Sequence, residues 1–106
     1  MEAALKALAE PNRRRILTLV RDEELTAGEI ASHFEVSRPA VSQHLTVLKE
    51  AGLVHERRNG TRRLYSVRPE GLTDVKAFLE AFWDEKLQAL KREAEREERK
   101  KRGKHD

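Results

Sequence analysis

The chain has 106 residues, of which 38% are hydrophobic and 39% charged, and its formal net charge is +3. This length fits one domain, since domains typically contain about 100–150 residues. Cysteine is absent, which excludes disulfides, thiolate metal sites, iron–sulfur clusters and thiol redox sensing. No apolar run approaches the roughly 18–20 residues of a membrane span, and no signal-peptide pattern is present, so we expect a cytoplasmic protein without a membrane partner.

Two short helices are predicted at the N-terminus. Residues 2–9 place Leu5 and Leu8 on one side and end before Pro11, because the residue before a proline avoids helical dihedrals. Pro11 suits the first turn of the next helix, where its missing N–H has no partner. Apolar residues follow at helical spacing until about Arg21.

A helix-turn-helix unit is predicted next. Thr26 and Glu29 have capping-box spacing at the start of one helix, which continues through Phe34. Ser37 is the predicted N-cap of a second helix over residues 37–51. The buried stripe of this second helix is Val41, Leu45 and Leu48. Only Glu35 and Val36 separate the two helices, and so short a connection is typical of a helix-turn-helix.

A β-hairpin is predicted after the second helix, with an Asn59–Gly60 turn in which both central residues take positive φ. With that two-residue loop, Arg57 faces Arg62, and a longer loop changes the pairing. The other pairs expected from this loop are Glu56 with Arg63 and Val54 with Tyr65. Two opposed arginines are unfavourable in isolation, and phosphates on either side of a groove would relieve the repulsion.

A long amphipathic helix is predicted beyond Pro69, where apolar residues recur at spacings of three and four. Three of the four Phe and Trp residues of the chain lie within residues 78–83. Such clustering favours a shared interface over a cover for the chain's own core, and we expect Leu5 and Leu8 to join that interface. The predicted interface residues are Leu5, Leu8, Leu72, Val75, Phe78, Leu79, Phe82, Trp83, Leu87 and Leu90.

The expected architecture is mainly α with a small β-hairpin: about five helices and a two-stranded wing. Residues 1–90 are expected to form a winged helix-turn-helix domain for DNA binding and dimerisation. Residues 91–106 alternate Lys or Arg with Glu and are expected to form a charged helical extension or a disordered tail.

The positive charge lies in the middle of the chain. Residues 37–67 contain six basic and two acidic side chains, whereas residues 1–36 contain five basic and seven acidic ones. A localised basic surface is the electrostatic footprint expected of a protein that binds nucleic-acid phosphates, and a solvated charged face is the alternative.

The second helix of a helix-turn-helix enters the major groove. Arg38 suits a bidentate contact with guanine and Gln43 one with adenine, while Ser37, the predicted N-cap, is short enough to contact a phosphate. The hydroxyls of Ser42 and Thr46 suit phosphates, and Pro39 and Ala40 suit a thymine methyl. The predicted DNA-binding residues are Ser37, Arg38, Pro39, Ala40, Ser42, Gln43, His44 and Thr46 on the helix and Arg57, Arg58, Asn59, Gly60, Thr61, Arg62 and Arg63 on the hairpin.

Several runs of the sequence resemble the ArsR-type winged-helix repressors over roughly residues 3–90. They are LTAGEIA at residues 25–31, VSRPAVSQHL at 36–45 and LKEAGLV at 48–54, preceded by ALAEP at 7–11 and RRRIL at 13–17. The resemblance implies a homodimeric repressor, joined through its first and last helices, that a signal releases from its operator. Because a two-fold symmetric helix-turn-helix dimer binds two half-sites, we expect that operator to be near-palindromic. The resemblance also implies a recognition helix at residues 37–51, which presents Ser37, Arg38, Ser42, Gln43 and His44 to DNA, and a wing at residues 57–63.

The sequence departs from that family at the sensing sites. Residues 26–28 are Thr, Ala and Gly where many relatives carry metal-binding cysteines, and residues 72–90 contain no histidine where other relatives carry ligands. His33, His44 and His55 have no ligand spacing and are expected to pack at the surface or at an interface. We therefore predict no metal and no cofactor, and no inducer is identified.

The sequence argues against two other classes of protein. An enzyme is not expected, because the chain has no phosphate loop, no nucleophile–base motif and no clustered carboxylates in an apolar setting. The second is a winged-helix protein-interaction module with an incidental basic wing. Such a module should present apolar anchors on the exposed face of residues 37–51, and that face is polar.

Overall fold

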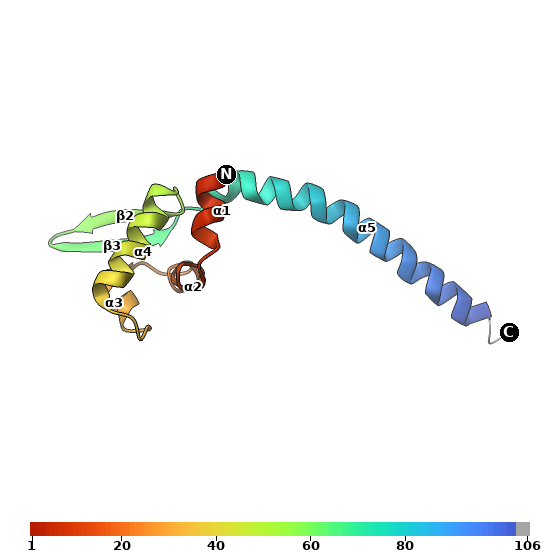
Figure 1. Cartoon of the computed structure of the whole chain (residues 1–106), viewed down its shortest axis with the longest axis horizontal. Helices are drawn as coiled ribbons and strands as arrows, with labels where there is room; N and C mark the ends of the chain where they lie inside the picture. Colours follow the sequence, from red (N-terminus) through yellow and green to blue (C-terminus); the bar gives the residue numbers. More distant parts are fainter. Residues whose placement is uncertain (104–106) are drawn as a thin grey trace. The chain divides into compact units, whose positions relative to one another are not determined.

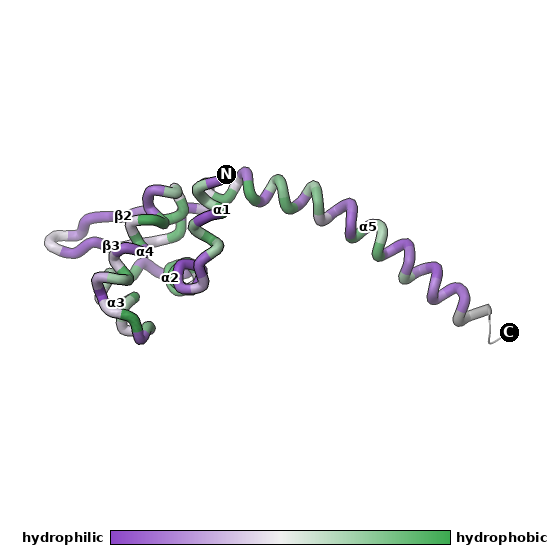
Figure 2. Tube along the Cα trace, viewed as in Figure 1, coloured by the Kyte–Doolittle hydropathy of each residue, from purple (hydrophilic) through white to green (hydrophobic). Residues whose placement is uncertain are grey.

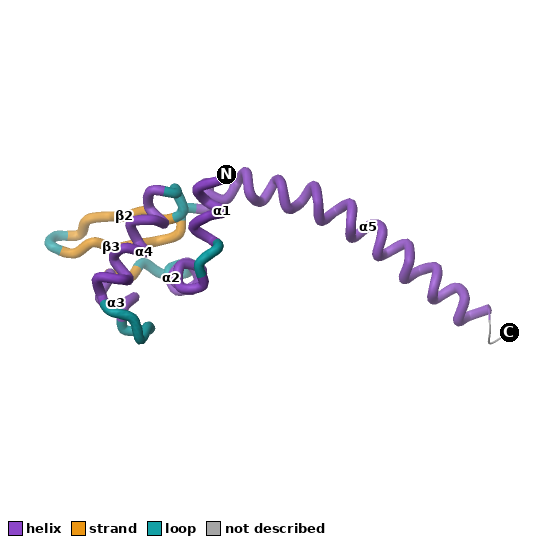
Figure 3. Tube along the Cα trace, viewed as in Figure 1, coloured by secondary structure: helices purple, strands orange, loops and turns teal. Residues whose placement is uncertain are grey.

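The computed structural model describes residues 1–103, with side chains described for residues 1–100. Within that part the helices are α1 (Glu2–Leu8), α2 (Pro11–Leu19), α3 (Ala27–Ala31), α4 (Arg38–Glu50), the 3-10 turn η1 (Pro69–Leu72) and α5 (Thr73–Gly103), and the strands are β1 (Leu25–Thr26), β2 (Val54–Asn59) and β3 (Arg62–Val67) (Figure 1, Figure 3). The predicted fold, mainly helical with a small β-hairpin, is confirmed. Residues 1–75 form one compact unit, and the described residues beyond residue 75 belong to a second.

The step between Glu10 and Pro11 separates α1 from α2, as predicted. Pro11 is the first residue of α2, and the Glu10 carboxylate accepts a hydrogen bond from the backbone N–H of Arg13 at 2.9 Å. This bond satisfies one of the amide donors that the start of a helix leaves open. α2 ends at Leu19, two residues before the predicted Arg21, which is within the usual variation of helix ends.

Both predicted caps of the helix-turn-helix are present. The Thr26 hydroxyl accepts a hydrogen bond from the backbone N–H of Glu29 at 3.1 Å, and the Glu29 carboxylate accepts one from the backbone N–H of Thr26 at 3.0 Å. The Ser37 hydroxyl accepts a hydrogen bond from the backbone N–H of Ala40 at 3.3 Å. The first turns of α3 and α4 are therefore fixed by side chains that the sequence identifies.

The predicted two-residue connection between these helices is wrong, because α3 ends at Ala31 and not near Phe34. The Ser32 hydroxyl donates a hydrogen bond to the backbone carbonyl of Glu29 at 2.6 Å. The next backbone N–H groups, up to that of Phe34, bond three residues back instead of four. This tighter turn closes the helix early, while Phe34 still packs against the core.

The hairpin is present, but its predicted register is wrong. Asn59 pairs with Arg62, so that Gly60 and Thr61 form the turn. Gly60 has a φ of 68°, and no non-glycine residue within the described chain has a positive φ. A turn with glycine alone at positive φ, in the first central position, is the type II′ pattern, whereas the prediction required two positive φ angles.

In the observed register Arg57 and Arg62 are not opposite each other, as they were in the prediction. Arg57 is opposite Leu64, and the two opposed arginines are instead Arg58 and Arg63. The other predicted pairs are likewise replaced, by Val54 with Val67 and Glu56 with Tyr65.

A third strand was not predicted. β1 pairs antiparallel with β3, so the described sheet has the order β1–β3–β2, with Leu25 opposite Tyr65 and Thr26 opposite Leu64. Two residues are too few to show an alternating pattern. Because Thr26 also caps α3, this strand attaches the start of α3 to the wing, the name used below for β2, β3 and their turn.

The core of residues 1–75 contains the predicted apolar stripe of α4. Val41, Leu45 and Leu48 are buried, together with residues from the helices and strands around them. The buried apolar residues are Ala4, Ala7, Ile16, Val20, Leu25, Ile30, Val41, Leu45, Leu48, Leu53, Val54 and Val75. Burial of this stripe leaves the opposite face of α4 open to solvent.

The last helix, α5, begins after the 3-10 turn η1 and extends to Gly103, so the charged extension predicted for residues 91–106 is helical as far as residue 103. Residues 104–106 lie outside the described residues. Apolar positions recur along the first part of α5, and the later part is mostly hydrophilic (Figure 2). In the described chain, no helix has the length and apolar character needed to span a membrane.

Candidate nucleic-acid interface

The exposed side of α4 carries most of the predicted helix contacts. Ser37, Arg38, Pro39, Ser42, Gln43 and Thr46 are exposed, and Ala40 is partly exposed; we call these residues the reading face. The Thr46 hydroxyl donates a hydrogen bond to the backbone carbonyl of Ser42 at 3.0 Å. Arg38 and Gln43 supply the side-chain groups on this face that suit base edges.

His44 lies apart from the reading face. Its Nδ1 is 3.9 Å from an oxygen of the Glu10 carboxylate, which caps α2, and its side chain is 20% exposed. The structure therefore directs His44 toward α2 and not toward the exposed residues of α4.

A groove joins the reading face to the wing. Its lining residues are Thr26, Ala27, Gly28, Arg38, Ser42, Thr61, Arg62, Arg63 and Tyr65; we call it the α3–wing groove. The Arg38 guanidinium lies beside Gly28, where a side-chain carbon would come within 3.7 Å of Cζ. The groove thus brings together three arginines from two separated parts of the sequence, in a surface suited to a polyanion.

The remaining predicted wing residues do not line this groove. Arg57, Arg58 and Asn59 are exposed on β2, and Gly60 is exposed at the turn. No atom lies within 4 Å of the position that a Gly60 side chain would occupy. The tip of the wing is therefore open to close approach by a partner.

Two of the wing arginines form ion pairs that the sequence did not predict. Arg57 donates two hydrogen bonds to the Glu24 carboxylate, and the Arg62 guanidinium lies 3.2 Å from a carboxylate oxygen of Glu29. The hydrogen bond from Arg57 lowers the pKa of Glu24. Hydrogen bonds from Thr26, with a smaller contribution from Arg62, lower the pKa of Glu29. Both carboxylates are therefore ionised at neutral pH and neutralise part of the wing's charge.

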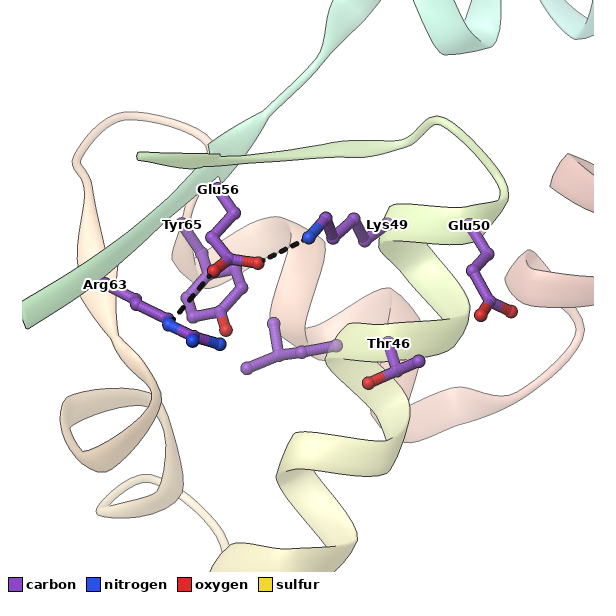
Figure 4. A pocket seen from close by; sticks show the side chains of 7 residues that line it. Thr46, Lys49, Glu50, Glu56, Arg63 and Tyr65 are labelled. Atoms are coloured by element: carbon purple, nitrogen blue, oxygen red, sulfur yellow. Dashed lines mark hydrogen bonds and ion pairs between the residues drawn. The ribbon is translucent and has the colours of Figure 1, made fainter. Parts of the chain in front are cut away.

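A second groove lies between α4 and the wing (Figure 4). Its lining residues are Leu45, Thr46, Lys49, Glu50, Glu56, Arg63 and Tyr65; we call it the Glu56 groove. The Glu56 carboxylate is 2.7 Å from Lys49 Nζ and 3.3 Å from Arg63 Nε. The hydrogen bond from Lys49 is the main cause that lowers the pKa of Glu56. Burial, with the nearby Glu56 charge, raises the pKa of Tyr65, so its phenol is neutral at physiological pH.

Tyr65 was missed as a candidate site residue, although it lines both grooves. Its partners across the sheet are Leu25 and Glu56. The sequence signal was present, since an aromatic residue in a basic strand next to a helix-turn-helix unit is a candidate for nucleic-acid contact.

The apolar residues predicted for dimerisation fall into two groups. The first group lies in the unit of residues 1–75: Val75 is only 5% exposed, Leu8 and Leu72 pack against the core, and Leu5 remains exposed. The second group belongs to α5 beyond residue 75 and is exposed, with Trp83 at 59%. Its members are Phe78, Leu79, Phe82, Trp83, Leu87 and Leu90; we call them the α5 apolar face.

The described residues contain no group of three or more His, Cys, Asp or Glu side chains that could hold a metal ion. His33 and His55 are exposed on the α3–α4 connection and on β2, respectively.

Comparison with known proteins relates this geometry to one family. Residues 10–56 match the model of the bacterial regulatory proteins of the arsR family. The chain is 46% identical over 86 residues to the HTH-type transcriptional regulator Rv2034 of Mycobacterium tuberculosis, covering 81% of this chain and 80% of that protein. It is 40% identical over 74 residues to the transcriptional repressor SdpR of Bacillus subtilis, covering 70% of this chain and 82% of the relative.

A solved structure gives the same relationship. The chain superposes with a TM-score of 0.63 and 33% identity on the homodimeric winged helix-turn-helix DNA-binding domain of a possible ArsR-family transcriptional regulator from Mycobacterium bovis, covering 79% of this chain and 78% of that domain. The helix-turn-helix of α3 and α4, the adjoining wing and these matches lead to one conclusion. The chain belongs to the ArsR family and is a winged helix-turn-helix transcriptional regulator.

Proposed function

We propose that the protein is a homodimeric repressor that binds a near-palindromic duplex operator, with α4 in the major groove. Arg38 and Gln43 contact base edges, and Ser37, Ser42 and Thr46 contact phosphate oxygens, Thr46 by turning its hydroxyl away from the Ser42 carbonyl. Pro39 and Ala40 contact a thymine methyl. The wing residues from Arg57 to Arg63 contact phosphates or the minor groove, and His44, which lies beside Glu10, is assigned no contact with DNA.

The observation that carries this proposal is the α3–wing groove. Arg38 from the start of α4 and Arg62 and Arg63 from β3 line one open surface. A duplex presents phosphates on both sides of each groove, so a helix flanked by a basic wing suits base reading and phosphate binding together. The polar character of the reading face favours DNA over a protein partner, because a protein-docking surface needs apolar anchors.

The α5 apolar face supports the homodimer. Six large apolar side chains exposed on one helix are costly in water, and a second copy of the helix would cover them. Leu5, which is exposed on α1, is also proposed as an interface residue, together with Leu8, Leu72 and Val75. The solved relative from Mycobacterium bovis is described as homodimeric, which agrees with this proposal.

Repression is proposed because the Bacillus subtilis relative is named a transcriptional repressor. Binding of a dimer to an operator blocks polymerase at the same site, without any catalytic step. The proposed place of action is the cytoplasm, where bacterial DNA lies.

Selection from a random pool of duplexes tests the proposal. The protein is incubated with the pool at physiological salt, and bound duplexes are recovered and sequenced over several rounds. We expect an inverted repeat whose half-sites have centres about 10–10.5 base pairs, or a multiple of that spacing, apart. Enrichment of no sequence, or of one without two-fold symmetry, contradicts the proposal.

A further inference from the structure

We propose that Glu56 is a positioning residue that sets the sequence selectivity of α4 by tying this helix to the wing. The inference rests on the proposed DNA-binding function. Glu56 itself is not assigned a contact with DNA.

The first observation is that one carboxylate joins two elements. Glu56 is on β2; one of its oxygens accepts a hydrogen bond from Lys49 Nζ near the end of α4 at 2.7 Å, and the other forms an ion pair with Arg63 Nε on β3 at 3.3 Å (Figure 4). The Glu56 side chain is only 15% exposed, whereas those of Lys49 and Arg63 are 55% and 56% exposed. The acid therefore lies beneath two cations that reach the surface.

Glu56 also balances the positive charge of its neighbours. Glu56 is an acid among the basic residues of the wing, and Arg58 also contributes to stabilising its charge. Without this carboxylate, Lys49 and Arg63 would face each other across the groove as like charges. The loss of both ion pairs, together with this repulsion, would loosen the contact between the last turn of α4 and the wing.

The contact between α4 and the wing affects selectivity because base reading depends on the relative position of these two elements. Base reading requires Arg38 and Gln43 to be aligned with the base edges of the DNA major groove while the wing contacts the DNA backbone. A connection between α4 and the wing fixes that relation before DNA binds, which lowers the entropy lost in the specific complex. Nonspecific binding depends on total charge and not on this alignment.

The two possible roles of Glu56 predict opposite effects of its removal. If Glu56 acted only as a nearby negative charge, Glu56→Gln would strengthen binding to every duplex. If Glu56 positions α4, Glu56→Gln strengthens binding to an unrelated duplex but weakens binding to the operator. Glu50→Gln is the matched control, since Glu50 lines the same groove and forms no ion pair in the described structure.

The experiment uses the full chain and two duplexes, one enriched by selection and one scrambled version of equal composition. Dissociation constants are measured for the wild type, Glu56→Gln, Glu50→Gln, Lys49→Gln and the double variant of Glu56 and Lys49. We expect the ratio of specific to nonspecific affinity to fall about tenfold in Glu56→Gln and in Lys49→Gln, without further loss in the double variant. Glu50→Gln should leave this ratio unchanged.

Equal strengthening on both duplexes by Glu56→Gln and Glu50→Gln would overturn the inference, as would additive losses in the double variant. Circular dichroism checks that each variant is folded. If Glu56→Gln is unfolded, the Lys49→Gln variant tests the inference by itself, because it removes the same ion pair by changing the other partner. If the wild type does not distinguish the two duplexes, the proposed function fails, which is a separate result from a failure of the inference.

Discussion

The Arg57 guanidinium donates two hydrogen bonds to the Glu24 carboxylate, from Nε at 3.0 Å and from Nη2 at 2.9 Å. A parallel, fork-like pair of this kind is the strongest geometry available to an arginine and a carboxylate. In the absence of DNA, therefore, an arginine assigned to phosphate binding already has an anionic partner. A phosphate has to compete with Glu24 for Arg57.

Removal of that competitor should strengthen DNA binding. We expect Glu24→Gln to raise affinity for specific and scrambled duplexes alike, by about two- to fivefold, because exposed ion pairs are weak. Asp22→Asn is the matched control, since Asp22 pairs with Arg21 and not with the wing. Fluorescence anisotropy measures the affinities of the wild type and of both variants for the two duplexes. If Glu24→Gln has the same effect when Arg57 is replaced by alanine, competition for Arg57 is not the cause.

Residues of the reading face and of the wing should have different effects on selectivity. Arg38→Ala and Gln43→Ala should each weaken binding to the selected operator by about tenfold or more and change nonspecific binding less. Arg62→Ala should weaken both and reduce the salt slope by about one. Titrations of operator and scrambled duplex across a salt series separate these cases. Equal losses from all three substitutions would contradict the assigned roles.

The α5 apolar face should control DNA binding indirectly. Trp83→Ala is expected to weaken dimerisation by at least about 30-fold, because large aromatic residues dominate such interfaces. Operator affinity should fall at low protein concentration and recover at high concentration, as mass action requires. Sedimentation equilibrium measures the dimer constant, with Gln88→Ala on the same helix as control. An unchanged dimer in the Trp83 variant contradicts the interface.

Stability should depend on pH through Glu24, Glu29 and Glu56. Each has a pKa below its ordinary value of 4.5, so its contribution is complete above that value and is lost as pH falls through the lowered pKa. The free energy of unfolding should therefore be steady near neutral pH and decline below about pH 4.5. Replacing all three by glutamine should lower stability at pH 7 and flatten the acid decline. Urea unfolding at fixed protein concentration measures both, and an unaltered slope in the triple variant would exclude these pairs as the cause.

The local features of the fold follow from the sequence, because their causes lie within a few residues. The proline start of α2, the caps at Thr26 and Ser37 and the buried stripe of α4 are all present where short-range rules predict them. The hairpin register was wrong because Asn-Gly is compatible with two turn positions, and only the pairing of Asn59 with Arg62 distinguishes them.

Long-range features did not follow from the sequence. Arg57 with Glu24 and Arg62 with Glu29 each join residues 33 positions apart. They meet because β1 pairs with β3, and β1, with two residues, is too short to predict from its pattern. The separation in sequence between the two glutamates equals that between the two arginines. This match indicates ion pairs only once the pairing of β1 with β3 is known. The sequence also did not distinguish which of the predicted interface residues pack within their own chain: Val75, near the start of α5, is 5% exposed.

In the proposed complex, α4 reads the bases of duplex DNA and the wing holds the DNA backbone. Fluorescence anisotropy of the selected operator and its scrambled counterpart, from about 50 to 200 mM salt, tests this claim most directly. We predict an affinity at least about a thousandfold higher for the operator at physiological salt, and a steep fall in both affinities as salt rises. Equal affinity for the two duplexes, or binding that does not change with salt, would contradict the claim.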